Sequence, residues 1–453
     1  MRMRGAQRPA AGAGRIALSD MLGFGPTIRG DTPVTEEMSG EQVEAEGGAL
    51  AGIRVLDLSR VLAGPWATQL LADFGAEVIK IERPDGGDDT RQWGPPYLAG
   101  PDGKSTGEAA YYLSTNRGKR SVCVDLAHAE GRRIVRDLAL RADVLMENFK
   151  VGTLARYGLS HDDLRSAHPG LVYCSISAFG QDGPDANNPG YDAMIQAMGG
   201  LMSITGIADG EPGAGPQKAG VAVADLMTGM YAATAVLGAL FERQRSGEGQ
   251  YIDLALLDTQ VGWLANQNLN FLVTGRAPRR HGTAHPNIVP YQAFATSDGF
   301  MMLAVGNDRQ FASLCAAAGC AHLAADSRFA TNSGRVAHRQ ELVPQIASVL
   351  HRRTTVEWLA VLNAAQVPCG PINDLAAVFA EPQVVHRGMR IEQPHPLAGR
   401  VPGVRNPVNY SRTALQYDRP PPLLGEHTDE VLREVLGLGQ ERLAALHASG
   451  AVR

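Results

Sequence analysis

Cysteine is scarce in this 453-residue sequence, and the few thiols are scattered along it. They are odd in number, and no Cys-x-x-Cys pair or Cys/His cluster has the spacing of a metal site. We therefore expect reduced, mostly buried thiols in a cytoplasmic protein without a bound metal. The cysteines are Cys123, Cys174, Cys315, Cys320 and Cys369.

Strong charge and long apolar runs are also missing. The net charge is only −5 at pH 7, and no block of basic residues offers a nucleic-acid-binding surface. No uninterrupted apolar run reaches the ~18 residues that a membrane-spanning helix needs. Hydrophobic residues make up 44% of the chain and charged residues 20%, as in soluble globular proteins. We expect neither a nucleic-acid nor a membrane partner.

The motifs of three common enzyme classes are absent. The first predicted turn between a strand and a helix is Ser59-Arg-Val-Leu-Ala-Gly-Pro65, which lacks the G-x-G-x-x-G pattern of dinucleotide sites. The chain also has no G-x-x-x-x-G-K-[ST] and no G-x-S-x-G motif. A dehydrogenase, a P-loop enzyme and a serine hydrolase are each disfavoured.

The pattern that is present is an alternation of strands and helices. The apolar run at 53–58 predicts a buried strand, and a helix with Pro65 in its first turn follows it. Residues 76–81 predict the next strand, which completes a βαβ unit. This alternation continues to about residue 180 and predicts a doubly wound, Rossmann-like parallel-sheet domain.

Four regions are predicted along the chain. Residues 1–49 form a disordered extension, with an Arg-rich start that also resembles an organellar presequence. Residues 50–270 form the large α/β domain, and residues 271–385 form a smaller mixed α/β domain. In the smaller domain, Asp298-Gly299 predicts a hairpin turn. Residues 386–453 form a C-terminal segment.

Basic residues lie near the ends of several predicted strands. In parallel sheets, ligands bind at the carboxyl ends of the strands, and basic side chains that converge there suit a ligand with phosphate groups. The sequence therefore predicts a phosphate-bearing ligand. The residues concerned are Arg83, Arg117, Lys119, Arg120, Lys150 and Arg156.

Two aspartates each stand at the head of an apolar, helix-like run. Asp192 closes the triplet Gly190-Tyr-Asp, and Asp225 closes the sequence Gly220-Val-Ala-Val-Ala-Asp. An aspartate at a helix start is commonly an N-cap. Such a carboxylate can also act as a nucleophile in covalent catalysis. We favour the nucleophilic role for Asp225.

A series of motifs runs in order along the chain: residues 52–58 with Ala63-Gly-Pro, Glu77-Val-Ile-Lys-Ile-Glu-Arg-Pro, Asn116-Arg-Gly-Lys-Arg-Ser, Asp143-Val-Leu-Met-Glu-Asn-Phe, Gly190-Tyr-Asp, residues 220–225 and Pro421-Pro-Leu-Leu-Gly-Glu-His-Thr-Asp-Glu-Val-Leu. Through these motifs the chain resembles, from Gly52 to its end, the family III (CaiB/BaiF-type) CoA-transferases. Two further motifs, Gly282-Thr-Ala-His-Pro-Asn-Ile-Val-Pro-Tyr-Gln-Ala-Phe and Gly370-Pro-Ile-Asn-Asp, are most similar to the succinate–hydroxymethylglutarate (glutarate) branch.

The resemblance implies transfer of CoA from a donor such as succinyl-CoA to a dicarboxylate, with Asp225 as nucleophile and Asp192 as a supporting acid. The carboxylate of Asp225 attacks the thioester to give a mixed anhydride, and an aspartyl-CoA thioester follows. We expect Asp225 to be ionised at neutral pH, because the ordinary pKa of Asp is about 3.9. The glycines Gly199, Gly200 and Gly229 are expected to bring backbone donors close to the oxyanion.

The resemblance also implies an interlocked homodimer, a C-terminal segment that returns to the large domain, and acyl-CoA and a small carboxylate as substrates without a permanently bound cofactor. Pro189 replaces a familiar lysine, so one CoA contact is missing or replaced. Leu62 stands where oxalate-handling members have glutamine, which disfavours an oxalyl substrate. The CoA-binding positions are Leu62, Ala63, Arg83, Val124, Asp125, Leu126, Ala127, Asn148, Phe149, Lys150 and Arg156.

Two other functions compete with CoA transfer. An α-methylacyl-CoA racemase of the same family needs a histidine before the aspartate of its Gly-x-Asp motif, where this chain has Tyr191. A non-catalytic acyl-CoA-binding protein on the same fold is the other alternative. The distal carboxylate of a diacid also needs a basic partner. Candidate substrate-binding residues are Tyr191, Arg279, Arg280, His281 and His285.

Overall fold

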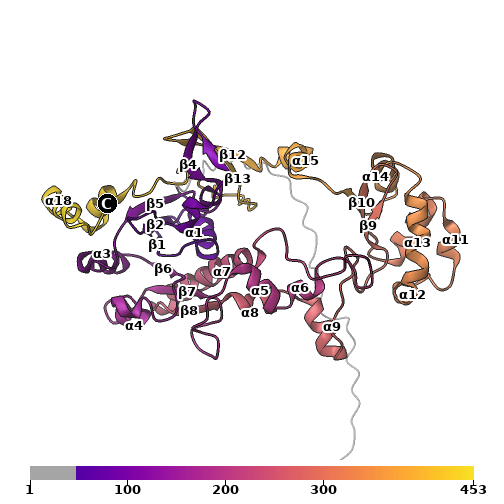
Figure 1. Ribbon diagram of the computed structural model, residues 1–453, viewed down its shortest axis with the longest axis horizontal. Coiled ribbons are helices and arrows are strands. Elements are labelled where there is room, and N and C mark those ends of the chain that lie inside the picture. Colours follow the sequence, from indigo (N-terminus) through magenta and orange to yellow (C-terminus); the bar gives the residue numbers. More distant parts are fainter. Residues whose placement is uncertain (1–46) are drawn as a thin grey trace, which may run out of the picture. The chain divides into compact units, whose positions relative to one another are not determined.

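The computed structural model describes residues 47–453, so most of the predicted N-terminal extension lies outside the described residues. A six-stranded, all-parallel sheet carries the larger core, with the strand order β5-β2-β1-β6-β7-β8 (Figure 1). This is the order of a doubly wound sheet, and the predicted parallel α/β sheet is confirmed. The strands are β1 (Arg54–Asp57), β2 (Glu77–Glu82), β5 (Lys119–Cys123), β6 (Val144–Glu147), β7 (Val172–Ser177) and β8 (Tyr251–Ala255).

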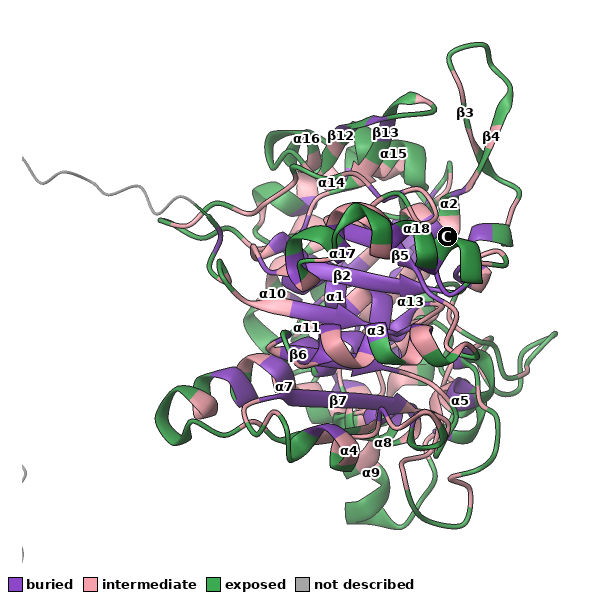
Figure 2. Cartoon of the chain, turned by 90° about the vertical axis from the view of Figure 1, so that its left-hand side faces the viewer, coloured by how far each residue is buried: buried purple, intermediate pink, exposed green. Residues whose placement is uncertain are grey.

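Both faces of the sheet are covered, which explains why its strands appear as nearly continuous apolar runs. Successive strand residues point to opposite faces, so Val55 and Leu56 enter two different cores. The core around Val55 includes α1 (Ala63–Asp73) and α7 (Val223–Ser246). The core around Leu56 includes α3 (Ala129–Ala139) and α17 (Thr428–Leu436). Figure 2 shows the strands as a buried layer.

The helix α7 is the longest described helix, with 24 residues, and Asp225 lies in its first turn. By length and composition alone it could cross a membrane, but its buried residues, such as Val236 and Leu240, pack into the core. Gly229 lets α7 approach α1 closely, since a Cβ at this position would lie 2.6 Å from the carbonyl oxygen of Ala63. This contact sets Asp225 beside the N-terminus of α1.

The end of the chain contacts the large sheet. Val452 forms an antiparallel bridge with Val124, and Thr428 Oγ1 accepts a hydrogen bond of 3.1 Å from the backbone N–H of Cys123. The helices α17 and α18 (Gln440–Ser449) contribute Leu432 and Leu446 to the same core as α3. The C-terminal helices therefore complete one face of the sheet.

A separate hydrophobic core lies between residues 289 and 367. Its antiparallel sheet has the order β11-β10-β9, and the predicted turn at Asp298-Gly299 joins β9 to β10. Trp358 and Phe311 are among its largest buried side chains. The elements are β9 (Tyr291–Ala295), β10 (Phe300–Ala304), β11 (Cys369–Pro371), α10 (Asp308–Ala317), α13 (Arg339–Leu350) and α14 (Thr355–Ala364).

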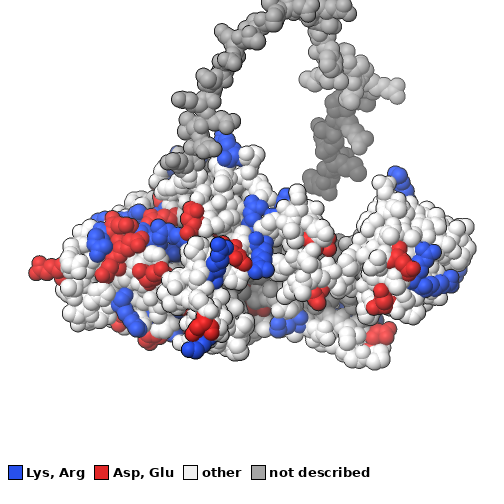
Figure 3. Space-filling view, turned by 90° about the horizontal axis from the view of Figure 1, so that it is seen from above, with Lys and Arg blue, Asp and Glu red and all other residues white. Residues whose placement is uncertain are grey.

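Charged side chains of both signs are intermixed on the face shown in Figure 3. Several form ion pairs, such as Arg54 with Glu77 at 2.7 Å and Arg243 with Asp143 at 2.9 Å. All five cysteines are free thiols, and four of them are buried. Within residues 47–453, no group of three or more His, Cys, Asp or Glu side chains is placed to hold a metal ion.

Candidate active site

Three adjoining cavities lie where the strands of the large sheet end. The carboxylate cavity, of about 650 Å³, is lined by Trp93, Tyr111, Asp192, Lys218 and Asp225 among others. The central cavity, of about 200 Å³, shares Val61, Leu62, Tyr191 and Asp225 with it. The outer cavity, of about 280 Å³, shares Arg60 and Phe149 with the central one. Shared walls join the three into one path, and Asp225 lies where the central cavity meets the carboxylate cavity.

Every strand of the sheet supplies the residue that immediately follows it to this path. Ligands of doubly wound sheets bind at the carboxyl ends of the strands, so the arrangement is that of a substrate site. The residues are Leu58 after β1, Arg83 after β2, Val124 after β5, Asn148 after β6, Ala178 after β7 and Leu256 after β8.

Asp225 is partly buried, and its surroundings disfavour its charge. Burial, followed by the charge of Asp192, raises the pKa of Asp225 to about 7. The expectation that this carboxyl is fully ionised at neutral pH is therefore wrong. It rested on the ordinary pKa of aspartate, whereas burial and a second carboxylate both depend on the tertiary structure.

Asp192 caps the helix that carries Asp225. Its Oδ1 accepts hydrogen bonds from the backbone N–H groups of Ala224, at 2.8 Å, and Asp225, at 3.4 Å. The N-cap residue of α7, Ala222, has no side-chain cap, so Asp192 supplies the missing acceptor from α5 (Asp192–Met198). Asp192 thus combines a capping role with an electrostatic one.

The N-terminus of α1 opens onto the central cavity. Leu62 is its N-cap, and no side chain caps this end. Among residues 47–453, the backbone N–H groups of Leu62 and Ala63 have no hydrogen-bond partner, and both residues line the cavity with Asp225. Unpaired N–H groups at a helix start favour an anion or an oxyanion.

The glycines that were expected to serve the oxyanion have a packing role instead. A Cβ at Gly229 would meet the carbonyl oxygen of Ala63, and a Cβ at Gly199 would lie 2.4 Å from Gln260 Cγ. Gly200 begins the short helix α6 (Leu201–Ile204) with φ +89°. Gly199 and Gly229 allow close contact between helices, and Gly200 allows a left-handed backbone turn, so the expectation of oxyanion donors there is corrected in favour of the start of α1.

The loop between β1 and α1 is held in a strained conformation. Val61 has φ +69°, a region that β-branched residues rarely adopt. Its N–H donates to both carboxylate oxygens of Asp88, at 3.2 and 3.3 Å. The backbone N–H of Arg60 donates to Asn148 Oδ1 at 2.8 Å, and Asn148 Nδ2 donates to the carbonyl oxygen of Arg60 at 2.7 Å. These contacts fix Val61 and Leu62 at the wall shared by two cavities.

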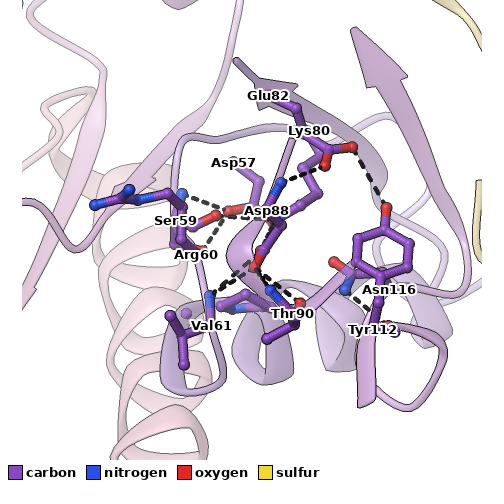
Figure 4. Close-up of polar contacts among 12 residues, drawn as sticks. Asp57, Ser59, Arg60, Val61, Lys80, Glu82, Asp88, Thr90, Tyr112 and Asn116 are labelled. Carbon is purple, nitrogen blue, oxygen red and sulfur yellow. Dashed lines mark hydrogen bonds and ion pairs between the residues drawn. The ribbon is translucent and has the colours of Figure 1, made fainter. Parts of the chain in front are cut away.

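A buried charge network supports this loop (Figure 4). Lys80 Nζ donates to Asp88, at 2.9 Å, and to the carbonyl oxygen of Ser59, at 2.9 Å. Lys119 Nζ lies 3.0 Å from Asp57 Oδ2, and all four charged side chains are inaccessible to solvent. Burial opposes the ionisation of Asp57, but Lys119 and Lys80 outweigh it and lower the pKa of Asp57 to about 2. The pairs are therefore ionic.

The predicted CoA-binding residues fall into two groups along the path. Arg156 lines none of the three cavities, although its neighbour Tyr157 lines the outer one. The outer cavity contains Arg83, Val124, Asp125, Leu126, Ala127 and Phe149. The central cavity contains Leu62, Ala63, Asn148, Phe149 and Lys150.

Three basic residues that were predicted to bind the ligand form ion pairs within the fold instead. Arg117 lies 2.7 Å from Asp73, and Lys119 pairs with Asp57. Arg120 pairs with glutamates of β2 and α17. The expectation that these residues converge on a ligand is wrong, since they lie at or just before the start of β5 rather than after its end. Arg60 was missed, although it lies only three residues after the end of β1 and lines two of the cavities.

The basic loop at 276–290 does not reach the described cavities. Arg280 pairs with Asp209, and the ring of His285 lies against Tyr291 with centroids 5.3 Å apart. Neither Arg279 nor His281 lines a cavity that contains Asp225, whereas Tyr191 lines two of them. A substrate-binding role for this loop stays a prediction.

Sequence reasoning also passed over three residues of the carboxylate cavity. Trp93 and Tyr111 form an edge-to-face pair with ring centroids 5.1 Å apart. Burial raises the pKa of Tyr111, and the charges of Asp225 and Asp192 add to the effect. Lys218 lies in a Gly/Pro-rich loop. The only feature of the sequence that could have pointed to it is its position seven residues before Asp225.

Comparisons with known proteins show which family the chain resembles along most of its length. Residues 50–428 match the sequence profile of CoA-transferase family III. A succinate–glutarate CoA-transferase of Agrobacterium fabrum is 52% identical over 85% of this chain and 95% of its own length. A succinyl-CoA:glutarate CoA-transferase of Mus musculus is 43% identical over 89% of this chain and 90% of its own. The crystal structure of a CaiB/BaiF family protein from Brucella suis is 47% identical and matches with a TM-score of 0.76, over 86% of this chain and 100% of that one.

Proposed function

The chain belongs to CoA-transferase family III, and we propose that it moves CoA from succinyl-CoA to a dicarboxylate, with glutarate as the first candidate, through a covalent intermediate on Asp225. The chain is a CoA-transferase, as the named relatives at 42 to 52% identity indicate. The observation that carries the proposal is the position of Asp225. It stands where the path lined by the CoA-binding positions meets the carboxylate cavity.

The three cavities suit the parts of an acyl-CoA. Arg60 and Arg83 line the outer cavity and would offer guanidinium groups to the phosphates. Both pair with the partly exposed carboxylate of Asp89, at 3.6 and 2.9 Å, and a phosphate would compete for these contacts. The small central cavity suits the narrow pantetheine arm, and Lys150 lies along it. The thioester then reaches Asp225 beside the unpaired N–H groups of Leu62 and Ala63.

The chemistry proceeds through two carboxyl exchanges. A carboxylate oxygen of Asp225 attacks the thioester carbon, the C–S bond breaks, and the CoA thiolate leaves a mixed anhydride. The thiolate attacks the aspartyl carbonyl, which releases succinate and gives the aspartyl-CoA thioester. The acceptor carboxylate then attacks this thioester, and the returning thiolate gives the new acyl-CoA and restores Asp225. The N–H groups of Leu62 and Ala63 would stabilise the oxyanions.

A racemase is less well supported by the same cavities. Racemisation needs two groups that exchange protons with the α-carbon, commonly including a histidine. No histidine of residues 47–453 lines either cavity that contains Asp225. Tyr191 occupies the position before Asp192, and its side chain is 68% exposed.

The proposal also covers the assembly and the location of the protein. We expect a homodimer in the cytoplasm, with CoA substrates and no permanently bound cofactor. Apolar side chains on α9 (Asn266–Thr274) support an interface, since Leu272 and Val273 are more than 70% exposed in the single chain. Light scattering on the purified protein would show one copy if this expectation fails.

The function is tested by incubating the protein with succinyl-CoA and one diacid at a time, and by identifying the CoA products by mass. The acceptors are glutarate, hydroxymethylglutarate, malate, itaconate, mesaconate and citramalate. The wild type is expected to form glutaryl-CoA, and Asp225→Ala is expected to form none. Absence of every acyl-CoA product with the wild type would refute the proposed function.

A further inference from the structure

The carboxylate cavity has a single basic side chain from the described residues, Lys218. The two ionisable acids there, Asp192 and Asp225, would repel a dicarboxylate. Trp66 and Trp93 give the cavity apolar walls that suit a methylene chain. A carboxylate that enters such a site gives up part of its hydration. Unless a protein group binds the carboxylate instead, this loss costs free energy. A cation near the other end of a diacid that presents one carboxylate to Asp225 would therefore favour its binding, and Lys218 is an exposed lysine that lines this cavity.

The backbone next to Lys218 is tied to the helix of Asp225 by a chain of hydrogen bonds. The N–H of Ala219 donates to Gln196 Oε1 at 2.9 Å. Gln196 is fully buried, and its Nε2 donates to Asp192 Oδ2 at 2.7 Å. Asp192 in turn caps α7 at Ala224. The backbone beside Lys218 is thus anchored to the helix of the nucleophile through Gln196 and Asp192.

The ammonium group of Lys218 keeps most of its hydrogen-bonding capacity. Its Nζ donates to the carbonyl oxygen of Ala219 at 3.1 Å, and no carboxylate of residues 47–453 forms an ion pair with it. An ammonium has three N–H donors, so two remain for a ligand. Arg280 differs, because its guanidinium is paired with Asp209 and also contacts the carbonyl oxygen of Ser203 at 3.4 Å.

We propose that Lys218 binds the distal carboxylate of the substrate diacid and gives the enzyme its preference for dicarboxylates over monocarboxylates. This inference rests on the proposed function of the same site. Donor acid and acceptor use the cavity in turn, so Lys218 serves the succinyl group of the donor as well as the acceptor. Its role is recognition, since the bonds that form and break lie at the other end of the acyl chain.

The test compares Lys218→Met and Lys218→Arg with wild type. Each enzyme is assayed with glutarate as acceptor, and with pentanoate, which has a methyl group in place of the distal carboxylate, as a competitive inhibitor. Loss of a charge-assisted hydrogen bond in Lys218→Met should raise the KM for glutarate about 10- to 100-fold. The Ki of pentanoate should stay within about 3-fold of wild type, and Lys218→Arg should recover most of the affinity.

Lys104→Met is the matched control, because Lys104 is 85% exposed on the β3–β4 hairpin (Tyr97–Ala99 and Ser105–Ala109) and lines none of the three cavities. Its kinetic constants should equal those of wild type. An unchanged KM for glutarate in Lys218→Met, with an active wild type, would overturn the role of Lys218 but leave the proposed function intact. An equal loss of affinity for glutarate and pentanoate would also overturn it. A wild type without any transfer would instead refute the proposed function.

Discussion

The carboxylate of Asp192 accepts a hydrogen bond of 3.4 Å from the backbone N–H of Asp225, the residue whose pKa it raises. One side chain thus has two effects on the candidate nucleophile. As a cap, it stabilises the first turn of α7. As a nearby negative charge, it favours the protonated form of Asp225 and adds to the effect of burial. The reactive state of the enzyme therefore depends on pH.

Activity should rise with pH through about 7 in the enzyme before it binds substrate. Only the ionised carboxylate of Asp225 can attack the thioester, and its pKa is raised to about 7 by burial and Asp192. A plot of kcat/KM for succinyl-CoA against pH should show this ionisation, because kcat/KM reports on the free enzyme. A profile that is flat from about pH 5.5 to 8.5 would contradict the raised pKa.

Two substitutions at Asp192 should separate its charge from its cap. Asp192→Asn keeps an oxygen that can accept from Ala224 but removes the charge, so the rise in kcat/KM should move to lower pH. Asp192→Ala removes the cap as well and should lower the unfolding free energy by about 1 kcal/mol more than the Asn variant. Denaturant unfolding and pH–rate profiles measure the two effects. Equal stability of both variants would exclude the capping role.

Asp225→Asn should make the protein more stable at high pH while it abolishes transfer. A carboxyl whose pKa is raised by folding keeps a proton that the unfolded chain loses between about pH 4 and 7, so the wild type loses stability as the pH rises through this range. The gain of the variant should be on the order of 2 kcal/mol at pH 8 and vanish near pH 4. Chemical unfolding at both pH values provides the measurement. A stability difference between variant and wild type that is the same at pH 4 and pH 8 would contradict the raised pKa of Asp225.

Removal of only one partner of the Lys80–Asp88 ion pair should strongly lower the unfolding free energy. Lys80→Met leaves the fully buried carboxylate of Asp88 without its partner and should cost about 3 to 5 kcal/mol of unfolding free energy. The double variant Lys80→Met, Asp88→Leu should be more stable than Lys80→Met alone. Lys104→Met, which removes the exposed pair with Asp102, should change stability by less than about 1 kcal/mol. A double variant as unstable as Lys80→Met would show that the charges themselves are not responsible.

Local pattern was sufficient to predict the parallel sheet, because strands buried on both faces, such as the one with Val55 and Leu56, carry unbroken apolar runs. It was not sufficient for the site. Asp225 has the same local pattern as an ordinary helix cap, and only the resemblance of the surrounding motifs distinguished it. The pairing of Lys119 with Asp57 joins residues 62 positions apart, so sequence could not show that this lysine is unavailable to a ligand.

Lys218 illustrates the same limit. The loop around Lys218 has neither a helical nor a strand period. Its backbone is connected to the helix of Asp225 by hydrogen bonds of Gln196, which lies on another helix. The more conspicuous basic residues at 276–290 were favoured because they are close together in sequence. The raised pKa of Asp225 depends likewise on burial by elements that are far apart in the chain.

The central claim, a covalent intermediate on Asp225, is tested most directly by intact-protein mass spectrometry after incubation with succinyl-CoA in the absence of an acceptor. The wild type should gain the mass of CoA less one water, and proteolysis should locate the thioester at Asp225. The adduct should disappear on addition of glutarate, and Asp225→Ala should show none. The same adduct on Asp225→Ala, or its location at another residue, would contradict the account.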